Sequence, residues 1–433
     1  DFLSDSYNKE IEVLQGSHDA ELQKRNEVIR KHNKSIDRLE KLGTYLSDKY
    51  VPESFPGCSL LVSQNNEEIY YFETGLRDRE KNTPIQRDTI FRIYSMTKPI
   101  TSLAIMILVE RGLMKISDEV EKYLPEWKNL SVYQSGDINN LITKPPKRKM
   151  IIHDLLTHRS GLTYHNEDSI ISKLYLEKKL MKRSSFGPDN LSSDNCINIL
   201  SGIPLKFSPG EHFNYSISTD ILGFIIERIS KKSLVDFFQE NILGPLEMKD
   251  TSFKISNSNL KRFASCYVYD SLENKYVLQD SSQKSKFSKI QNINLGGAGL
   301  ISTIDDYMKF CNLIQNDGSI GTQNIIGSKT LNYMISNQLD NGKDLFNIAK
   351  GKWSKSSFKG IGYSLAGSVV IDPIANLTTR SIGEFSWGGA AETLFWIDKK
   401  EKISVVFMAQ MLTYPHDQNL KDDLRNFVYQ SII

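Results

Sequence analysis

Ser95 and Lys98 are the two residues whose types and spacing most directly indicate chemistry. They are followed by an apolar, helix-forming run over 99–111 and then by Gly112, a residue type that commonly ends helices. Because side chains three positions apart share one face of a helix, we expect the Lys98 amine to reach the Ser95 hydroxyl. A serine hydroxyl needs a nearby base to attack a carbonyl, and a lysine whose charge is disfavoured by burial can be that base. The pair therefore predicts a nucleophile of the S-x-x-K type.

The S-x-x-K spacing alone is not specific. Four other serines have a lysine three residues later, namely Ser6, Ser258, Ser281 and Ser356. These four lie in polar, irregular stretches, whereas Ser95 stands at the start of a predicted apolar helix. The positive end of that helix dipole would favour developing negative charge. The alternative interpretation of Ser95 is an ordinary helix N-cap beside a solvated lysine.

Tyr215 is a second candidate for proton transfer. It lies in a polar loop that runs into an apolar helix over 213–223, and the turn residues of 207–210 precede it. A tyrosine presented at such a junction can shuttle a proton if a cation stabilises its phenolate. The alternative is a half-buried packing residue, which is the usual role of any one of the 19 tyrosines.

Trp387, Gly388 and Gly389 form a third candidate segment, just before a predicted strand at Leu394. Paired glycines at the start of a strand let a ligand approach the backbone closely. A backbone N–H in this segment could therefore serve as one half of an oxyanion hole. The alternative is a β-bulge without a chemical role.

Length and charge set limits on the class of protein. At 433 residues the chain exceeds the usual size of one domain, so we expect two lobes. Its 54 basic and 52 acidic residues give a net charge of +2, which provides no electrostatic reason to expect nucleic acid as a partner. The apolar run over 103–109 is too short to span a bilayer. The first residues show no signal-peptide pattern, and we expect a soluble protein, with the cytoplasm favoured over the periplasm.

Sequence motifs of several other catalytic classes are absent. No serine lies in G-x-S-x-G, which argues against an α/β-hydrolase, and there is no G-x-G-x-x-G or Walker A loop. His153 and His158 do not match the H-E-x-x-H zinc helix, and we interpret them as structural. The cysteines are scattered and indicate neither a disulfide framework nor a zinc site; they are Cys58, Cys196, Cys266 and Cys311. We therefore expect no metal and no cofactor.

The predicted strands come from the two ends of the chain. They cover 58–63 and 68–72, which flank an Asn65-Asn66 turn, and then 363–371, 394–397 and 403–408. Helices are predicted over about 8–50 and from Leu420 to the C-terminus, and the middle is mainly helical. We expect an α+β fold with one antiparallel sheet flanked by terminal helices and a mainly helical lobe inserted. The predicted domains are an N-terminal helical extension over 1–35, an α/β domain over 36–94 and 361–433, and a helical domain over 95–360.

In their order along the chain, the three motifs resemble those of the serine β-lactamase-like superfamily. The resemblance is closest to the carboxylesterases related to class C β-lactamases, often called family VIII esterases, and it extends from about residue 38 to the C-terminus. It is carried by the segments 91–102, 154–162, 296–303 and 387–391 as well as by Tyr215. The resemblance implies a β-lactamase/transpeptidase-like fold and a cofactor-free serine hydrolase.

The resemblance also implies roles for individual residues. Ser95 would be the nucleophile that forms an acyl-enzyme, and Lys98 with Tyr215 would be the general base pair. The backbone amides of Ser95 and Ala390 would form the oxyanion hole. The substrate would be bound by Trp387, Gly388, Gly389 and Tyr164.

Two departures from the penicillin-recognising members of the superfamily favour esters over lactams. Ile217 replaces the asparagine of Tyr-x-Asn, and Trp387 with its two glycines replaces Lys-Thr-Gly. A β-lactam carboxylate would lose an amide donor and a cation, at a cost of roughly 1.5–3 kcal/mol for a charge-assisted hydrogen bond. We therefore expect a hydrolase of small carboxylic esters or related acyl substrates.

Three other functions stay open at the level of sequence. The first is acyl transfer on the same scaffold, and the second is β-lactamase or D-alanyl carboxypeptidase activity. The third is a non-catalytic scaffold protein that assembles through the charged N-terminal helix. The sequence does not decide between a monomer and a homodimer.

Overall fold

The computed structural model describes residues 2–432, apart from 52, 183–184, 187–190, 350 and 414–418. The chain divides into two compact units, of which one comprises 1–50 with 417–433 and the other comprises 51–416. The two units separate the terminal helices from the rest of the chain. This separation does not test the domain boundaries predicted at residues 35, 94 and 360, which stay predictions.

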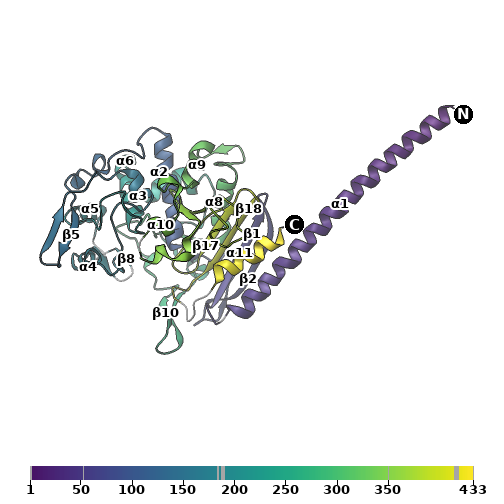
Figure 1. Ribbon diagram of the computed structural model, residues 1–433. Coiled ribbons are helices and arrows are strands. Elements are labelled where there is room, and N and C mark those ends of the chain that lie inside the picture. Colours follow the sequence, from purple (N-terminus) through teal and green to yellow (C-terminus); the bar gives the residue numbers. More distant parts are fainter. Residues whose placement is uncertain are drawn as a thin grey trace. The chain divides into compact units, whose positions relative to one another are not determined.

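The larger unit contains an eight-stranded antiparallel sheet, which lies on one side of the unit, with α3 (Ile152–Leu156), α4 (Ile170–Glu177), α5 (Ser193–Ser201) and α6 (Ser218–Ser230) on the other side (Figure 1). Its strand order is β14-β15-β16-β17-β18-β1-β2-β3, so strands from the two ends of the chain are neighbours at its middle. The strands are β14 (Ile361–Tyr363), β15 (Ser368–Val370), β16 (Phe385–Gly388), β17 (Leu394–Asp398), β18 (Ile403–Ala409), β1 (Gly57–Gln64), β2 (Glu67–Asp78) and β3 (Thr83–Pro84). Leu60 of β1 pairs with Phe407 of β18, and both are fully buried. The predicted antiparallel sheet built from both chain ends is confirmed.

The hairpin of β1 and β2 follows the sequence prediction. Asn65 and Asn66 both have positive φ, at 54° and 65°, which is the conformation of the tight turns that suit the twist of a hairpin. The prediction of one strand over 363–371 is wrong, because a turn separates β14 from β15. In that turn the Ser364 amide donates to the Gly367 carbonyl at 2.8 Å.

Between β3 and β14 the chain forms helices that alternate with turns, irregular stretches and short strand pairs. The most deeply placed helix is α2 (Thr97–Glu110), in which every residue from Thr97 to Leu108 is buried. Helix α8 (Ile304–Gln315) packs against β17 and β18, with the ring centroids of Tyr307 and Phe395 5.1 Å apart. The other helices of this unit, besides α3 to α6, are α7 (Leu234–Phe238), α9 (Ser328–Ile335) and α10 (Leu345–Ile348).

Short strand pairs lie outside the main sheet. They are formed by β4 (Phe91–Arg92) with β11 (Ile301–Ser302), β5 (Val132–Gly136) with β6 (Leu141–Lys144), β7 (Met181–Lys182) with β8 (Ser185–Phe186), β9 (Cys266–Asp270) with β10 (Lys275–Asp280), and β12 (Ser319–Ile320) with β13 (Gln323–Asn324). The pair of β4 and β11 matters for the site, because β4 leads directly into the Ser95 turn.

The smaller unit consists of α1 (Phe2–Lys49) and α11 (Leu420–Ser431). Asp423 of α11 joins them, since its Oδ2 atom accepts hydrogen bonds from the Tyr45 hydroxyl at 2.9 Å and the Tyr50 hydroxyl at 2.6 Å. Lys49 completes the contact through an ion pair with Asp423 at 2.9 Å. Among the described residues, no helix is both long enough and apolar enough to cross a membrane.

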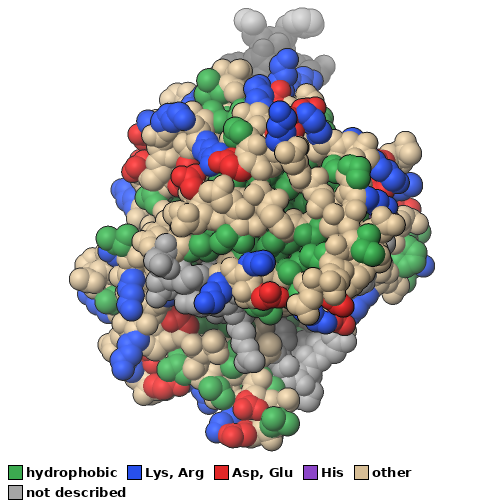
Figure 2. All heavy atoms as spheres, turned by 90° about the vertical axis from the view of Figure 1, so that its left-hand side faces the viewer, with side chains coloured by type: hydrophobic (Ala, Val, Ile, Leu, Met, Phe, Trp, Pro, Cys, Tyr) green, Lys and Arg blue, Asp and Glu red, His purple; other side chains and the backbone are tan. Residues whose placement is uncertain are grey.

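The face of the molecule that Figure 2 shows carries basic and acidic side chains that are interspersed. All four cysteines are free and buried.

Candidate active site

Ser95 lies half-buried at the entry to helix α2. A short 3₁₀ turn, η1 (Tyr94–Met96), precedes the helix, and the Met96 amide closes it by donating to the Ile93 carbonyl at 2.9 Å. Tyr94 has a φ of 42°, which a bulky residue adopts only where the surrounding structure enforces it. The backbone is therefore held in a constrained turn immediately before the serine.

The Lys98 side chain reaches Ser95 within one helical turn. Its Nζ atom donates to Ser95 Oγ at 3.2 Å and to the Gly297 carbonyl at 2.7 Å. Only 1% of Lys98 is exposed, so the amine is shielded from water and held by specific partners. The helical spacing of the S-x-x-K motif thus produces a hydroxyl–amine contact.

Tyr215 faces the same lysine from the loop before α6. Lys98 Nζ lies 4.7 Å from the centroid of the Tyr215 ring. The Tyr215 hydroxyl is buried and has no hydrogen-bond partner among the residues that the structure describes. The structure therefore brings the phenol to the amine but records no direct hydrogen bond from Tyr215 to Ser95 or to Lys98.

The segment with paired glycines packs against the backbone that leads to Ser95. Trp387 and Gly388 end strand β16, and Gly389 begins the turn to β17, in which its amide donates to the Thr393 carbonyl at 2.7 Å. A Cβ atom on Gly389 would lie 2.4 Å from the Ile93 carbonyl oxygen and 2.2 Å from Thr393 Oγ1. Only glycine permits this approach, which places Gly389 against the Ile93 carbonyl, two residues before Ser95.

Aromatic rings surround Tyr215 on several sides. The centroid of its ring lies 5.5 Å from that of Trp387, 5.6 Å from that of Tyr164 and 5.2 Å from that of Trp353. Trp353, from the 3₁₀ helix η8 (Gly351–Ser354), also stacks on Trp387 with ring planes 8° apart. The predicted residues Trp387 and Tyr164 thus meet at Tyr215. Trp353 was not predicted, because it is a single tryptophan in a polar stretch without a motif.

His158 stands behind Tyr215, with ring centroids 4.6 Å apart. Burial and the positive charge of Lys98 lower the pKa of the His158 imidazole well below its ordinary value, so the ring is neutral. Its Nδ1 atom accepts a hydrogen bond from the Ser216 amide at 3.2 Å. A neutral imidazole carries one proton, so Nε2 is the protonated nitrogen. His158 therefore fixes the backbone next to Tyr215 and carries no charge.

Gly297 and Asp220 also reach this site, although the sequence analysis assigned neither a role. The Gly297 carbonyl accepts from Lys98, and its amide donates to Asp220 Oδ1 at 2.8 Å. The signal available in the sequence was indirect, since Gly297 lies in the glycine-rich 296–299 stretch and Asp220 follows Tyr215 by five residues.

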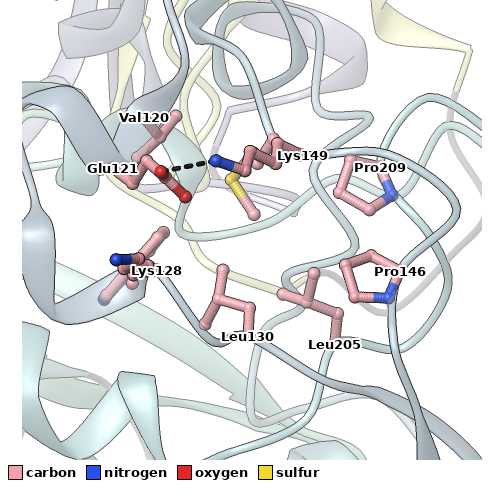
Figure 3. A pocket seen from close by; sticks show the side chains of 10 residues that line it. Val120, Glu121, Lys128, Leu130, Pro146, Lys149, Leu205 and Pro209 are labelled. Carbon is pink, nitrogen blue, oxygen red and sulfur yellow. Dashed lines mark hydrogen bonds and ion pairs between the residues drawn. The ribbon is translucent and has the colours of Figure 1, made fainter.

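Two cavities of the larger unit lie away from these residues. One, of about 30 Å³, is lined mainly by apolar side chains and bordered by the ion pair of Lys149 with Glu121 (Figure 3). The other, of about 510 Å³, is lined by ion-paired residues that include Arg148, Arg159 and Asp340. Neither is lined by Ser95, Lys98 or Tyr215. Among the described residues, no group of three or more His, Cys, Asp or Glu side chains could hold a metal ion.

Comparison with known proteins adds relatives that span most of the chain. The profile of the family described as Beta-lactamase matches residues 42–430. Protein Rv1367c of Mycobacterium tuberculosis is 31% identical over 360 residues, which cover 82% of this chain and 85% of that protein. Esterase EstB of Burkholderia gladioli is 25% identical over 390 residues, covering 86% and 90%. The solved structure of EstCE1, described as a hydrolase with promiscuous acyltransferase activity, has a TM-score of 0.73 at 22% identity and covers 92% of this chain and 99% of its own.

Proposed function

Because the chain belongs to the beta-lactamase family, we propose that it is a serine hydrolase that cleaves small carboxylic esters through an acyl-enzyme on Ser95. The family match and the likeness to EstCE1 confirm the predicted β-lactamase/transpeptidase-like fold. Members and neighbours of this family include serine hydrolases and acyltransferases. The proposal concerns which of these activities the chain has and which residues perform it.

The contact between Lys98 Nζ and Ser95 Oγ, at 3.2 Å on a buried helix, is the observation that carries the proposal. In the proposed first step, Ser95 Oγ attacks the ester carbonyl carbon while its proton passes to the pair of Lys98 and Tyr215. The backbone amides of Ser95 and Ala390 would stabilise the oxyanion. The alcohol then leaves with the transferred proton, and water attacks the acyl-enzyme to release the acid.

Two features of the site favour esters over lactams. Ile217 is fully buried in the hydrophobic core, so the position that carries the asparagine of Tyr-x-Asn offers no amide donor. Trp387, Gly388 and Gly389 supply no cation where the penicillin-recognising proteins have a lysine. An ester without a carboxylate requires neither group. The aromatic surroundings of Tyr215 suit an apolar acyl or alcohol group at the same place.

Kinetics with a short-chain nitrophenyl ester test the proposed activity. We expect a burst of nitrophenolate equal to the amount of enzyme, followed by steady turnover, because the acyl-enzyme forms faster than it hydrolyses. Nitrocefin should be turned over at least about tenfold less efficiently, because its carboxylate lacks a charge-assisted partner. A folded protein without ester turnover, or with nitrocefin as its better substrate, would contradict the proposal.

Acyl transfer is a second candidate, and the rings around Tyr215 are the observation that favours it. Trp353, Trp387 and Tyr164 lie around the Tyr215 ring on several sides, so an acyl group that packed among these rings would be less accessible to water. Product analysis with and without an added alcohol separates the two activities. A transferase forms mainly the new ester when the alcohol is present, whereas a hydrolase continues to release mainly the acid.

A further inference from the structure

Asp220 is a buried carboxyl group that the proposed mechanism does not use. It lies in the first turn of α6, five residues after Tyr215, and only 2% of it is exposed. Among the residues that the structure describes, no Lys, Arg or His side chain forms an ion pair with it. Burying an ionised carboxylate is costly unless nearby charge and hydrogen bonds compensate. The position of Asp220 therefore needs a physical explanation.

Gly297 links this carboxyl group to Lys98. Asp220 Oδ1 accepts the Gly297 amide at 2.8 Å, and the Gly297 carbonyl accepts from Lys98 Nζ at 2.7 Å. A Cβ atom on Gly297 would lie 2.7 Å and 2.8 Å from the two carboxyl oxygens. The carboxyl group thus packs directly on the glycine whose carbonyl holds the lysine.

The charges around Asp220 are few. Burial raises its pKa to about 6, against the opposing effects of the Lys98 charge and the Gly297 amide. The positive charge of Lys98, on α2, lowers the pKa of Asp220. The negative charge of an ionised Asp220 in turn raises the pKa of the Tyr164 phenol and of the Cys196 thiol of α5. Both of these are neutral, since burial raises the pKa of each, so Lys98 is the charge that compensates an ionised Asp220.

We propose that Asp220 is a positioning residue whose ionised carboxylate, acting through Gly297, holds the Lys98 amine at Ser95, so that acylation depends on the ionisation of Asp220. This inference rests on the proposed function, because it concerns the step in which Ser95 is acylated. The neutral carboxyl group of acidic solution makes a weaker bond to the Gly297 amide than the carboxylate does. Acylation should therefore become faster as the pH rises through the range in which Asp220 ionises.

Asp220→Asn tests the inference, because asparagine keeps the shape and the oxygen acceptor but cannot ionise. We expect its acylation rate with a nitrophenyl ester to match that of the wild type near pH 5 and to be about 10- to 100-fold lower at pH 8, the range expected for a lost charge-assisted contact. The matched control is Asp306→Asn. Asp306 is another buried carboxyl group in the first helical turn, in α8, and it accepts the Asp250 amide at 2.7 Å. Its pH profile should follow the wild type.

A ratio of wild-type to Asp220→Asn rates that stays constant from pH 5 to pH 8 would overturn the inference. The stability of the variant also distinguishes positioning from a structural role. A carboxyl group with a raised pKa stabilises the fold below its unfolded-state pKa, and this contribution is lost as the pH rises through about 6. Asp220→Asn should therefore unfold at pH 8 no lower in temperature than the wild type.

Thermal unfolding of a second variant, Lys98→Met, tests the inference without substrate. It depends neither on catalysis nor on whether Asp220→Asn folds. Replacing Lys98 by methionine removes the compensating cation, so the loss in unfolding temperature should be larger at pH 8, where Asp220 is ionised, than at pH 5. An equal loss at both pH values would overturn the inference. Because no ester is used, this result separates a failure of the inference from a failure of the proposed function, which a wild type without an ester burst would reveal.

Discussion

Replacing Ser95 by alanine is expected to lower kcat/KM for a nitrophenyl ester by about 10⁴-fold or more. The variant lacks the oxygen that would form the acyl-enzyme, and the remaining site could contribute only binding and oxyanion stabilisation. Its fold should be unchanged, because Ser95 is only half-buried and the substitution removes a small group whose hydrogen bond is with Lys98. Steady-state rates and the size of the nitrophenolate burst measure the effect.

Ser356→Ala is the matched control for this variant. Ser356 also has a lysine three residues later, Lys359, but it is exposed and begins the short 3₁₀ helix η9 (Ser356–Phe358). The control should keep the wild-type burst. If Ser95→Ala kept the burst as well, or if Ser356→Ala lost it, the assignment of the nucleophile would be wrong.

Replacing Lys98 by methionine is expected to slow acylation by about 10²- to 10⁴-fold, the range of contributions from general acid–base groups. Methionine fills a similar volume, so the buried space around α2 stays occupied, but it cannot donate to Ser95 Oγ or to the Gly297 carbonyl. Single-turnover kinetics at pH 8 report the acylation step directly. The loss should fall on the acylation rate, with little change in ester binding.

Lys359→Met controls for the loss of a lysine as such, because Lys359 is exposed and its Nζ atom lies 5.0 Å from the centroid of the Phe346 ring. It should acylate like the wild type. A Lys98→Met enzyme that acylates within about threefold of the wild type would show that the amine is not needed, since a factor of three is less than 1 kcal/mol.

Local patterns in the sequence predicted β1, β2, β17 and β18 of the sheet but did not predict β3 or β16. The Asn65-Asn66 turn predicts a hairpin through its own backbone preference, and alternating apolar runs predict the strands on either side. The apolar residues of the last helix likewise predict α11, in which Leu424 and Val428 are fully buried. The single strand predicted over 363–371 was wrong because the turn at Ser364 depends on its contact with Gly367, within an otherwise apolar run.

Residues of the site could be predicted only where helical spacing or a sequence motif indicates them. Ser95 and Lys98 are three residues apart, in the 3₁₀ turn η1 and the first turn of α2, so local helical backbone sets their distance. Gly297 contributes a backbone carbonyl, which leaves no side-chain signature, and Trp353 joins the aromatic cluster from a segment far along the chain. Asp220 is a single carboxyl group whose contact with Gly297 crosses 77 positions. Contacts of this kind depend on the folded chain and cannot be read from local pattern.

The smaller unit contains the helix that the sequence predicts over about 8–50, which the structure shows as α1 over Phe2–Lys49. The boundary of the N-terminal extension at residue 35 stays a prediction. The last turns of α1 meet α11 through Asp423, with Tyr45 and Tyr50 as hydrogen-bond donors. A role of this unit in assembly, and the choice between monomer and homodimer, stay predictions that size measurement with and without 1–35 would test.

The most direct test of the account is the intact mass of the protein after reaction with an alkyl phosphonate ester that carries a nitrophenyl leaving group. Such a reagent phosphonylates an activated serine and remains attached. We predict one adduct per chain, mapped by peptide analysis to Ser95, and its absence in Ser95→Ala with its retention in Ser356→Ala. An unmodified wild type, or an adduct on any other residue, would contradict the claim that Ser95 is the nucleophile.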